Sequence, residues 1–186
     1  MTLYAFTDGA SRGNPGEAGI GVIVRDEKGK VVLELYGAIG KCTNNAAEYR
    51  ALLTLLGRVA TLPASRIVIH SDSELMVRQL NGQYRVRDRG LRPYFERAKR
   101  LLQNLQIPFE IRSIPREKNR EADRLANRGI DERTPLPVSD RPEGTQGFLF
   151  QINNKNNNTA GRAAASRSFR RSRDEESPNS KEQGAP

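Results

Sequence analysis

The stretch FTDGASRGNPG, residues 6–16, decides how the rest of the chain is interpreted. It places a lone carboxylate, Asp8, where an apolar strand over residues 2–8 is predicted to end, with three glycines close behind it. Side chains alternate along a strand, so Asp8 shares a face with Tyr4 and Phe6. A carboxylate at a strand end either caps a turn or belongs to a site that a ligand backbone can approach closely across the glycines.

Apolar periodicity along the remaining chain indicates one α/β domain. Alternation and β-branched runs predict further strands at residues 18–26, 31–39, 66–72 and 107–114. Helical spacing of leucines and alanines predicts helices at residues 43–62, 73–82, 90–105 and 119–129. The order β-β-β-α-β-α-α-β-α is typical of a mixed sheet with helices packed on its faces.

The composition changes after the last predicted helix. Residues 134–145 are rich in proline, and from Gln151 onward the chain is rich in Asn, Ser, Arg and Ala, with few apolar residues to bury. We therefore expect a folded domain over residues 1–133 and a linker with a disordered tail over residues 134–186. A short apolar segment, QGFLF at residues 146–150, interrupts the tail.

Cysteine content and charge restrict the compartment and the partner. Cys42 is the single cysteine, so no internal disulfide can form, which fits a reducing compartment. The first residues do not resemble a signal peptide, and no apolar run is long enough for a membrane span. We expect a soluble cytoplasmic monomer. The net charge is +9, and residues 78–133 hold 15 Lys and Arg against 8 Asp and Glu, which indicates either a polyanionic partner or a well-solvated helix surface.

Three further carboxylates stand at positions comparable to that of Asp8. Glu48 lies on the apolar stripe of its predicted helix, Asp72 ends the strand at residues 66–72, and Asp123 flanks the apolar stripe of the last helix. Each alone could cap an element or pair with an arginine. If the first strand pairs with residues 66–72, however, Asp8 and Asp72 meet and repel each other. A hard cation among oxygen ligands removes that repulsion, so we expect Asp8 to bind Mg²⁺, with Mn²⁺ as a substitute.

Four blocks of the chain resemble the type 1 ribonuclease H family in order and spacing. They are TDGASRGNPG, TNNAAEYRAL, SDSELMVRQLNGQY and REKNREADRLAN, spread over residues 1–130. The resemblance implies a ribonuclease H-like fold with a five-stranded mixed sheet flanked by helices. It also implies an endoribonuclease that cuts the RNA strand of RNA–DNA hybrids and leaves 5′-phosphate and 3′-hydroxyl ends. The implied catalytic centre holds two Mg²⁺ ions on the carboxylates Asp8, Glu48, Asp72 and Asp123.

The same resemblance implies positions that contact the hybrid. Ser11, Gly13 and Asn14 match the loop that approaches RNA 2′-hydroxyls, the groups that distinguish RNA from DNA. Two amides, Asn44 and Asn45, match the pair that enters the minor groove. Thr43 and Lys41 match the pocket for a phosphate of the DNA strand. Helix capping is the structural alternative for residues 43–45, and one residue can serve both purposes.

The chain departs from the family pattern at two places. The loop SIPREKNREAD lacks the histidine that many members carry before the fourth carboxylate, and Arg116 or Glu117 is its nearest substitute. His70 we expect to be a packed strand residue. The basic, tryptophan-bearing protrusion is also missing, because residues 81–95 are too few to form it and the chain has no Trp. Arginines of that segment, including Arg85 and Arg87, are expected to grip the DNA strand through phosphates instead.

Three alternatives to a hybrid-specific nuclease remain open from the sequence. The missing protrusion could widen the substrate range to double-stranded RNA, the chain could be a hybrid-binding module without catalysis, or it could be a detached domain of a reverse transcriptase. For the tail, Gln146, Leu149 and Phe150 resemble the anchors of peptides that dock onto the bacterial sliding clamp. The alternative is that these apolar residues fold back onto the domain.

Overall fold

The computed structural model describes residues 1–135 of the chain, and the elements below refer to that part. Five strands form a single sheet: β1 Thr2–Gly13, β2 Gly16–Arg25, β3 Val31–Cys42, β4 Arg66–Ser71 and β5 Phe109–Ser113. The helices are α1 Asn44–Val59, α2 Glu74–Leu80, α3 Arg92–Gln103 and α4 Arg120–Asp131, and a short 3₁₀ turn, η1 Arg116–Lys118, precedes α4.

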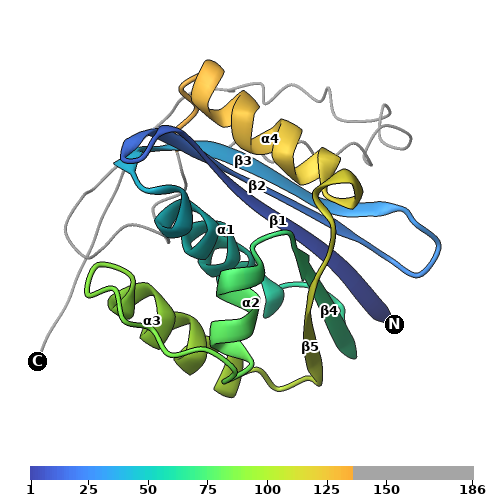
Figure 1. Cartoon of the computed structure of the whole chain (residues 1–186). Helices are drawn as coiled ribbons and strands as arrows, with labels where there is room; N and C mark the ends of the chain where they lie inside the picture. Colours follow the sequence, from blue (N-terminus) through green and yellow to red (C-terminus); the bar gives the residue numbers. More distant parts are fainter. Residues whose placement is uncertain (136–186) are drawn as a thin grey trace, which may run out of the picture. The chain divides into compact units, whose positions relative to one another are not determined.

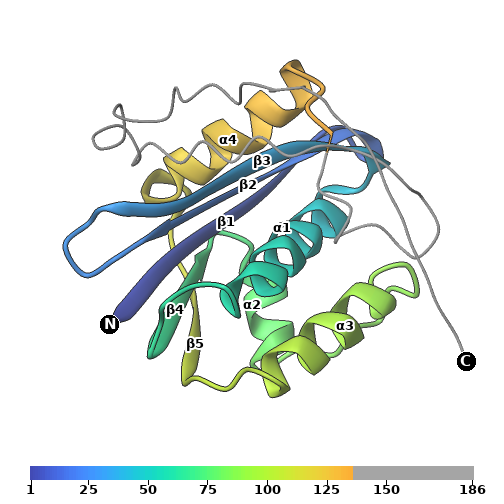
Figure 2. The ribbon, with the colours of Figure 1, turned by 180° about the vertical axis from the view of Figure 1, so that it is seen from behind.

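The strand order in the sheet is β3-β2-β1-β4-β5. β1 and β2 pair antiparallel, as do β2 and β3, whereas β4 runs parallel to both β1 and β5. Helices α1, α2 and α3 lie on one side of the sheet and α4 lies on the other (Figures 1 and 2). The predicted five-stranded mixed sheet with flanking helices is therefore confirmed, together with the predicted order of elements.

Helix α1 forms the centre of the core because its apolar residues recur on the face that meets β1 and β2. Leu52 and Leu55 are fully buried there, together with Leu3 of β1 and Ile20 of β2. The Thr43 hydroxyl caps the helix by accepting from the N–H of Ala46 (3.3 Å). The helix thus begins at the edge of the sheet where β3 ends, which places Glu48 one turn into the helix.

Strand β1 is longer than predicted, and this changes the roles expected of Asp8 and the glycines that follow it. Asp8 does not end the strand, because β1 continues to Gly13 and pairs with β2 up to Gly16. Gly9 admits a helix rather than a substrate: a Cβ on Gly9 would lie 2.1 Å from the backbone carbon of Ala47 in α1. What does end near Asp8 is the parallel pairing with β4, whose last pair is Thr7 with Ser71.

Helix α4 packs closely on the opposite face of the sheet. Gly21, the partner of Asp8 across the β1–β2 ladder, has no side chain to keep the helix away. A Cβ on Gly21 would lie 2.1 Å from the carbonyl oxygen of Ala122. The alternation of glycines with Ile20 and Val22 in β2 therefore serves both faces, since the glycines meet α4 while the two apolar side chains enter the core under α1.

The chain still contacts the sheet where the described part ends. The N–H of Ala38 in β3 donates to the carbonyl of Thr134 (2.6 Å), and Ala38 bridges to Pro135. Within residues 1–135 no helix has the length and apolar character needed to cross a membrane. The predicted linker and tail, including Gln146, Leu149 and Phe150, lie outside the described residues apart from Thr134 and Pro135.

Candidate active site

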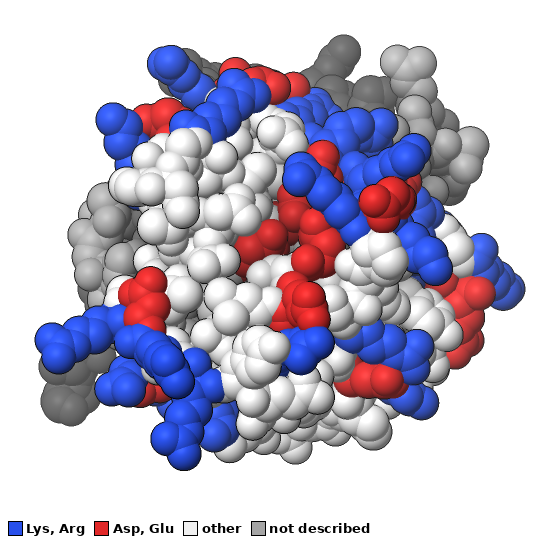
Figure 3. All heavy atoms as spheres, viewed as in Figure 1, with Lys and Arg blue, Asp and Glu red and all other residues white. Residues whose placement is uncertain are grey.

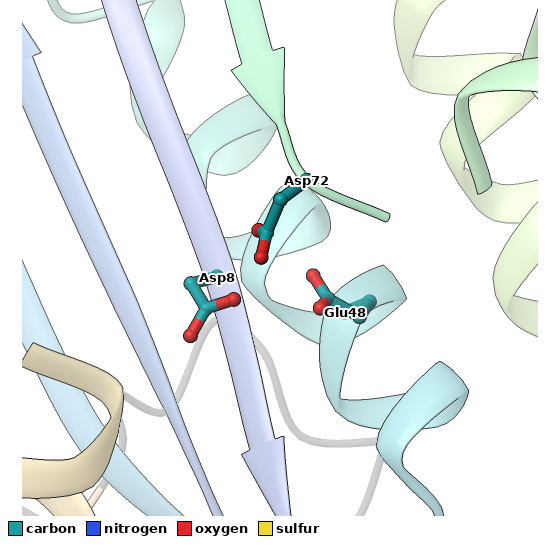
Figure 4. A group of neighbouring side chains, drawn as sticks. All are labelled: Asp8, Glu48 and Asp72. Atoms are coloured by element: carbon teal, nitrogen blue, oxygen red, sulfur yellow. The ribbon is translucent and has the colours of Figure 1, made fainter. Parts of the chain in front are cut away.

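Three carboxylates from three separate elements converge beside the central strand β1, where its pairing with β4 ends. Asp8 comes from β1, Glu48 from the first turns of α1, and Asp72 from the residue that follows β4. One carboxylate oxygen from each lies within 4.8 Å of the others, and the side chains point toward one another (Figure 4). Asp8 and Glu48 are each only 4% exposed. This is the arrangement in which a hard cation replaces the hydration that the carboxylates have lost.

The electrostatics of this cluster favour protonation when no cation is present. Burial, followed by the negative charges of Asp72 and Asp123, raises the pKa of Asp8 to about 7. Burial, followed by the charge of Asp8, raises the pKa of Glu48 well above its ordinary value. One N–H opposes this trend, because the backbone amide of Gly9 donates to Glu48 Oε2 (3.2 Å).

The fourth predicted ligand, Asp123, lies next to the three-carboxylate cluster rather than within it. Its Oδ1 accepts from an exposed arginine of η1, Arg116, at 2.9 Å. A pocket of about 240 Å³ is lined by these two residues with Glu117 and Arg120. A larger pocket, of about 570 Å³, includes Arg12, Asp131 and Arg133 but none of the four predicted ligands.

Asn119 is a site residue that the sequence analysis did not single out. It precedes α4, where an asparagine is typical of a helix cap, yet its side chain makes no capping hydrogen bond. Its Nδ2 instead donates to Oδ1 of Asp72 (2.6 Å) and to the carbonyl of Thr7 (2.9 Å). Both acceptors are distant in sequence, so no local pattern could have revealed these contacts.

His70 is packed into the sheet, as expected. Its ring stacks on Phe6 with centroids 4.7 Å apart, and Nδ1 lies 3.2 Å from the carbonyl oxygen of Ala5. Burial lowers the pKa of His70 below its ordinary value, so the imidazole is neutral at pH 7. A neutral, stacked ring is poorly suited to take the place of the missing loop histidine.

The residues expected to meet the hybrid gather where the β1–β2 hairpin touches the start of α1. The Ser11 hydroxyl lies within donor distance of the carbonyls of Gly13 (2.5 Å) and Cys42 (2.9 Å). Asn14 Oδ1 accepts from the N–H of Asn44 (3.2 Å). Hydrogen bonds thus fix the hairpin against the helix terminus, and the exposed Lys41, Asn44 and Asn45 lie at this junction.

The expected grip on the DNA strand lies at a different place on the molecule. Arg85 and Arg87 are exposed in the segment that connects α2 to α3, which contains no further helix. On the face seen in Figure 3, acidic atoms line a hollow in the middle, and Lys and Arg atoms lie on either side of it, over the α3 region and over α4. An anionic duplex laid across this face would meet cations on both flanks.

Comparison with known proteins identifies relatives over this same part of the chain. Residues 6–129 match the family model described as reverse transcriptase-like. Ribonuclease HI of Halobacterium salinarum is 39% identical over 130 residues, which cover 70% of this chain and 65% of that protein. The bifunctional protein Rv2228c of Mycobacterium tuberculosis is 38% identical over 142 residues, which cover 75% of this chain and 38% of that protein. The chain therefore spans less than two thirds of either relative.

Solved structures agree with the sequence relatives. The crystal structure of ribonuclease H1 from Halobacterium salinarum has a TM-score of 0.67 at 39% identity, with coverage of 71% of this chain and 99% of that one. LC11 ribonuclease H1, solved in complex with an RNA/DNA hybrid, has a TM-score of 0.66 at 40% identity, with coverage of 70% and 97%.

Proposed function

Because this chain belongs to the type 1 ribonuclease H family, we propose that it is an endoribonuclease that hydrolyses the RNA strand of RNA–DNA hybrids. The products are 5′-phosphate and 3′-hydroxyl ends. The observation that carries the proposal is the convergence of Asp8, Glu48 and Asp72 within 4.8 Å. The related LC11 enzyme, with its RNA/DNA hybrid, supports the choice of substrate.

The carboxylate cluster fits divalent metal ions, Mg²⁺ by preference and Mn²⁺ as a substitute. Its ligands are all oxygen atoms, and burial together with their repulsion raises the pKa of Asp8, so the ionised cluster requires a compensating charge. Asp8, Glu48 and Asp72 would hold the ions. Asp123 would become the fourth ligand by giving up its ion pair with Arg116 for a metal ion. When bound, two such ions supply an activated water and stabilise charge on the phosphate and on the leaving oxygen.

The protein's own residues bind and orient the substrate. The β1–β2 hairpin and the first residues of α1 present Ser11, Gly13, Asn14, Asn44 and Asn45 to the minor groove, where the 2′-hydroxyl of RNA is read. Thr43 and Lys41 form the phosphate pocket on the DNA strand. The hydrogen bond from Asn44 to Asn14 supports this assignment, because it keeps the two amide-bearing segments in one fixed arrangement before substrate binds.

The DNA strand is held across the α2–α3 segment by Arg85 and Arg87, which are exposed. The enzyme acts as a cytoplasmic monomer; the lone Cys42, which can form no internal disulfide, fits a reducing compartment. A sliding clamp, bound through Gln146, Leu149 and Phe150, is the proposed partner of the tail.

Cleavage of three end-labelled duplexes tests the proposal. RNA–DNA, RNA–RNA and DNA–DNA substrates are incubated with Mg²⁺, Mn²⁺ or EDTA, and the products are resolved by size and by end group. We expect cutting of the RNA strand of the hybrid with either metal and none with EDTA. Cutting of RNA–RNA at a comparable rate would extend the substrate class, and binding of the hybrid without any cutting would make the chain a binding module.

A further inference from the structure

Asn119 connects three of the elements that carry the carboxylates. Its Nδ2 donates to the carbonyl of Thr7, the residue before Asp8 in β1, and to Oδ1 of Asp72, the residue after β4. The backbone carbonyl of Asn119 accepts a hydrogen bond from the N–H of Asp123 in the first turn of α4 (3.0 Å). One buried residue therefore bridges β1, the end of β4 and the start of α4.

The orientation of this amide is determined by its surroundings. Both acceptors of the Nδ2 group are oxygen atoms, and turning the amide over would place Oδ1 against them with no proton between. Asn119 is only 1% exposed, so water does not compete for these bonds. The two Nδ2 protons are both used, which gives the Asp72 carboxylate a fixed donor on one side. A carboxylate has about four lone-pair positions, so those left over can still meet a cation.

General stability does not account for this arrangement. In residues 1–135, two buried side-chain atoms have no hydrogen-bond partner, and they are Oδ1 of Asn119 and Oγ1 of Thr7. A buried acceptor without a partner lowers stability, and an apolar residue would avoid that cost. The side chain does not cap α4 either. Its contacts serve Asp72 and the strand beside Asp8.

We propose that Asn119 is a positioning residue that holds the Asp72 carboxylate in the orientation in which the Asp8–Glu48–Asp72 cluster receives divalent metal. Asp72 follows the last paired residue of β4, so the sheet does not fix its side chain, and repulsion from the nearby Asp8 and Glu48 would turn it away. The donor from Asn119 opposes that rotation. This inference rests on the proposed function, because it concerns the same metal-dependent site.

The test compares Asn119→Ala and Asn119→Ser with Asn127→Ala in the full-length chain. Asn127 is a matched control, since it lies on α4, the helix that follows Asn119, and its Nδ2 donates to the backbone carbonyl of Asp123 rather than to a carboxylate (2.9 Å). Mg²⁺ affinity is measured by calorimetry without substrate, and circular dichroism reports the folded fraction. We expect Asn119→Ala to bind Mg²⁺ about 10–100-fold more weakly, as is typical for loss of a residue that orients a metal ligand.

Activity assays then separate positioning from structure. The Mg²⁺ concentration for half-maximal cleavage should rise with Asn119→Ala by the same factor, while KM for the hybrid at saturating Mg²⁺ stays within twofold. Asn119→Ser, which retains a donor, should recover part of the loss, and Asn127→Ala should match the wild type. Folded Asn119→Ala with wild-type Mg²⁺ affinity would overturn the inference, as would unfolding of both Asn119 variants, which would make the residue structural.

Failure of the proposed function would be seen separately, in the wild type. If the wild-type chain cleaves no hybrid at any Mg²⁺ concentration, the proposed function is wrong. If it cleaves the hybrid and Asn119→Ala keeps the wild-type metal dependence, only the positioning role is wrong.

Discussion

Replacing Asp8 with Asn should make the metal-free protein more stable and remove its activity. The cause is the environment of the carboxylate, which is buried, lies beside Asp72 and Glu48, and has a pKa of about 7. Asn has nearly the same shape but does not ionise. The variant therefore removes one charge from the cluster without leaving a cavity, and it removes a metal ligand at the same time.

The magnitude follows from linkage between protonation and folding. The ordinary pKa of this carboxyl is 3.8, and in the folded chain it is about 7. Between these values the folded state binds more protons than the unfolded state, so the free energy of unfolding decreases as pH rises. At about 1.4 kcal/mol per pKa unit, the free energy of unfolding of the wild type, compared with its value at pH below the ordinary pKa, falls by about 2 kcal/mol at pH 5 and by about 4 kcal/mol at pH 8. The amide introduced by Asp8→Asn carries no such dependence, so the advantage of the variant should widen by about 2–3 kcal/mol between pH 5 and pH 8.

The assay is urea denaturation in EDTA at both pH values, with Glu96→Gln as the control. Glu96 is an exposed carboxylate on α3, so its replacement removes one negative charge outside the buried cluster. Adding Mg²⁺ at ten times its dissociation constant should stabilise the wild type at pH 8 by about 1.4 kcal/mol and Asp8→Asn by much less. An advantage of Asp8→Asn that is equal at pH 5 and pH 8 would refute the reasoning, and near-wild-type cleavage by the variant would refute its role as a metal ligand.

Other changes test the remaining parts of the site. Gly9→Ala should destabilise the chain by about 1–3 kcal/mol or more and lower the maximal rate, because its Cβ would overlap the backbone of Ala47 in α1. Gly57→Ala, at an exposed position of α1, should instead stabilise the chain by about 1 kcal/mol. Unfolding curves and initial rates decide this, and a fully active, stable Gly9→Ala would contradict the packing argument. The triple variant of the α2–α3 segment, in which Ala replaces Arg85, Arg87 and Arg89, should have a higher KM for the hybrid and a weaker dependence of binding on salt, with little change in maximal rate. An unchanged salt dependence would place the contacts with the DNA strand elsewhere. A chain that ends at Pro135 should cleave free hybrids at the full rate and lose clamp binding in a pull-down, whereas aggregation of that chain would support the tail folding back.

The sequence predicted the architecture because its signals are local. Alternation of apolar residues marked the strands, leucine spacing marked α1, and Gly29 marked the turn between β2 and β3, where it adopts a φ of +78°. Glu48 was placed on the buried stripe from the positions of Leu52 and Leu55, and it is buried with them. Each of these features depends on neighbours within about one or two helical turns or a few strand residues.

Features that depend on distant contacts were not predictable in the same way. Residues 9–13 look like a flexible loop in the sequence, but pairing with β2 makes them a strand, and Gly9 is required by α1 rather than by a turn. Asn119 looks like a helix cap, yet its partners are 47 and 112 residues away. The ion pair of Asp123 with Arg116 spans only seven residues, but it depends on the path of the chain through η1, a 3₁₀ turn that the sequence pattern did not indicate. Spacing alone does not reveal where such side chains meet.

These distant contacts share a consequence for how the site works. Asp8 sits on a strand paired on both sides up to its position, Gly9 fixes the approach of the helix that carries Glu48, and Gly21 fixes the approach of the helix that carries Asp123. The backbones that carry the carboxylates therefore cannot move apart when no cation is present, because α1 is packed closely against β1 and α4 against β2, and only the side-chain orientations remain to be fixed. Burial of these carboxylates, together with their repulsion, lowers the stability of the metal-free fold and appears as the raised pKa of Asp8. A cation that enters this site meets ligands already close together, so little of its binding energy is lost to rearrangement. On this reasoning, substitutions that relieve the repulsion should stabilise the fold in proportion to the metal affinity that they remove.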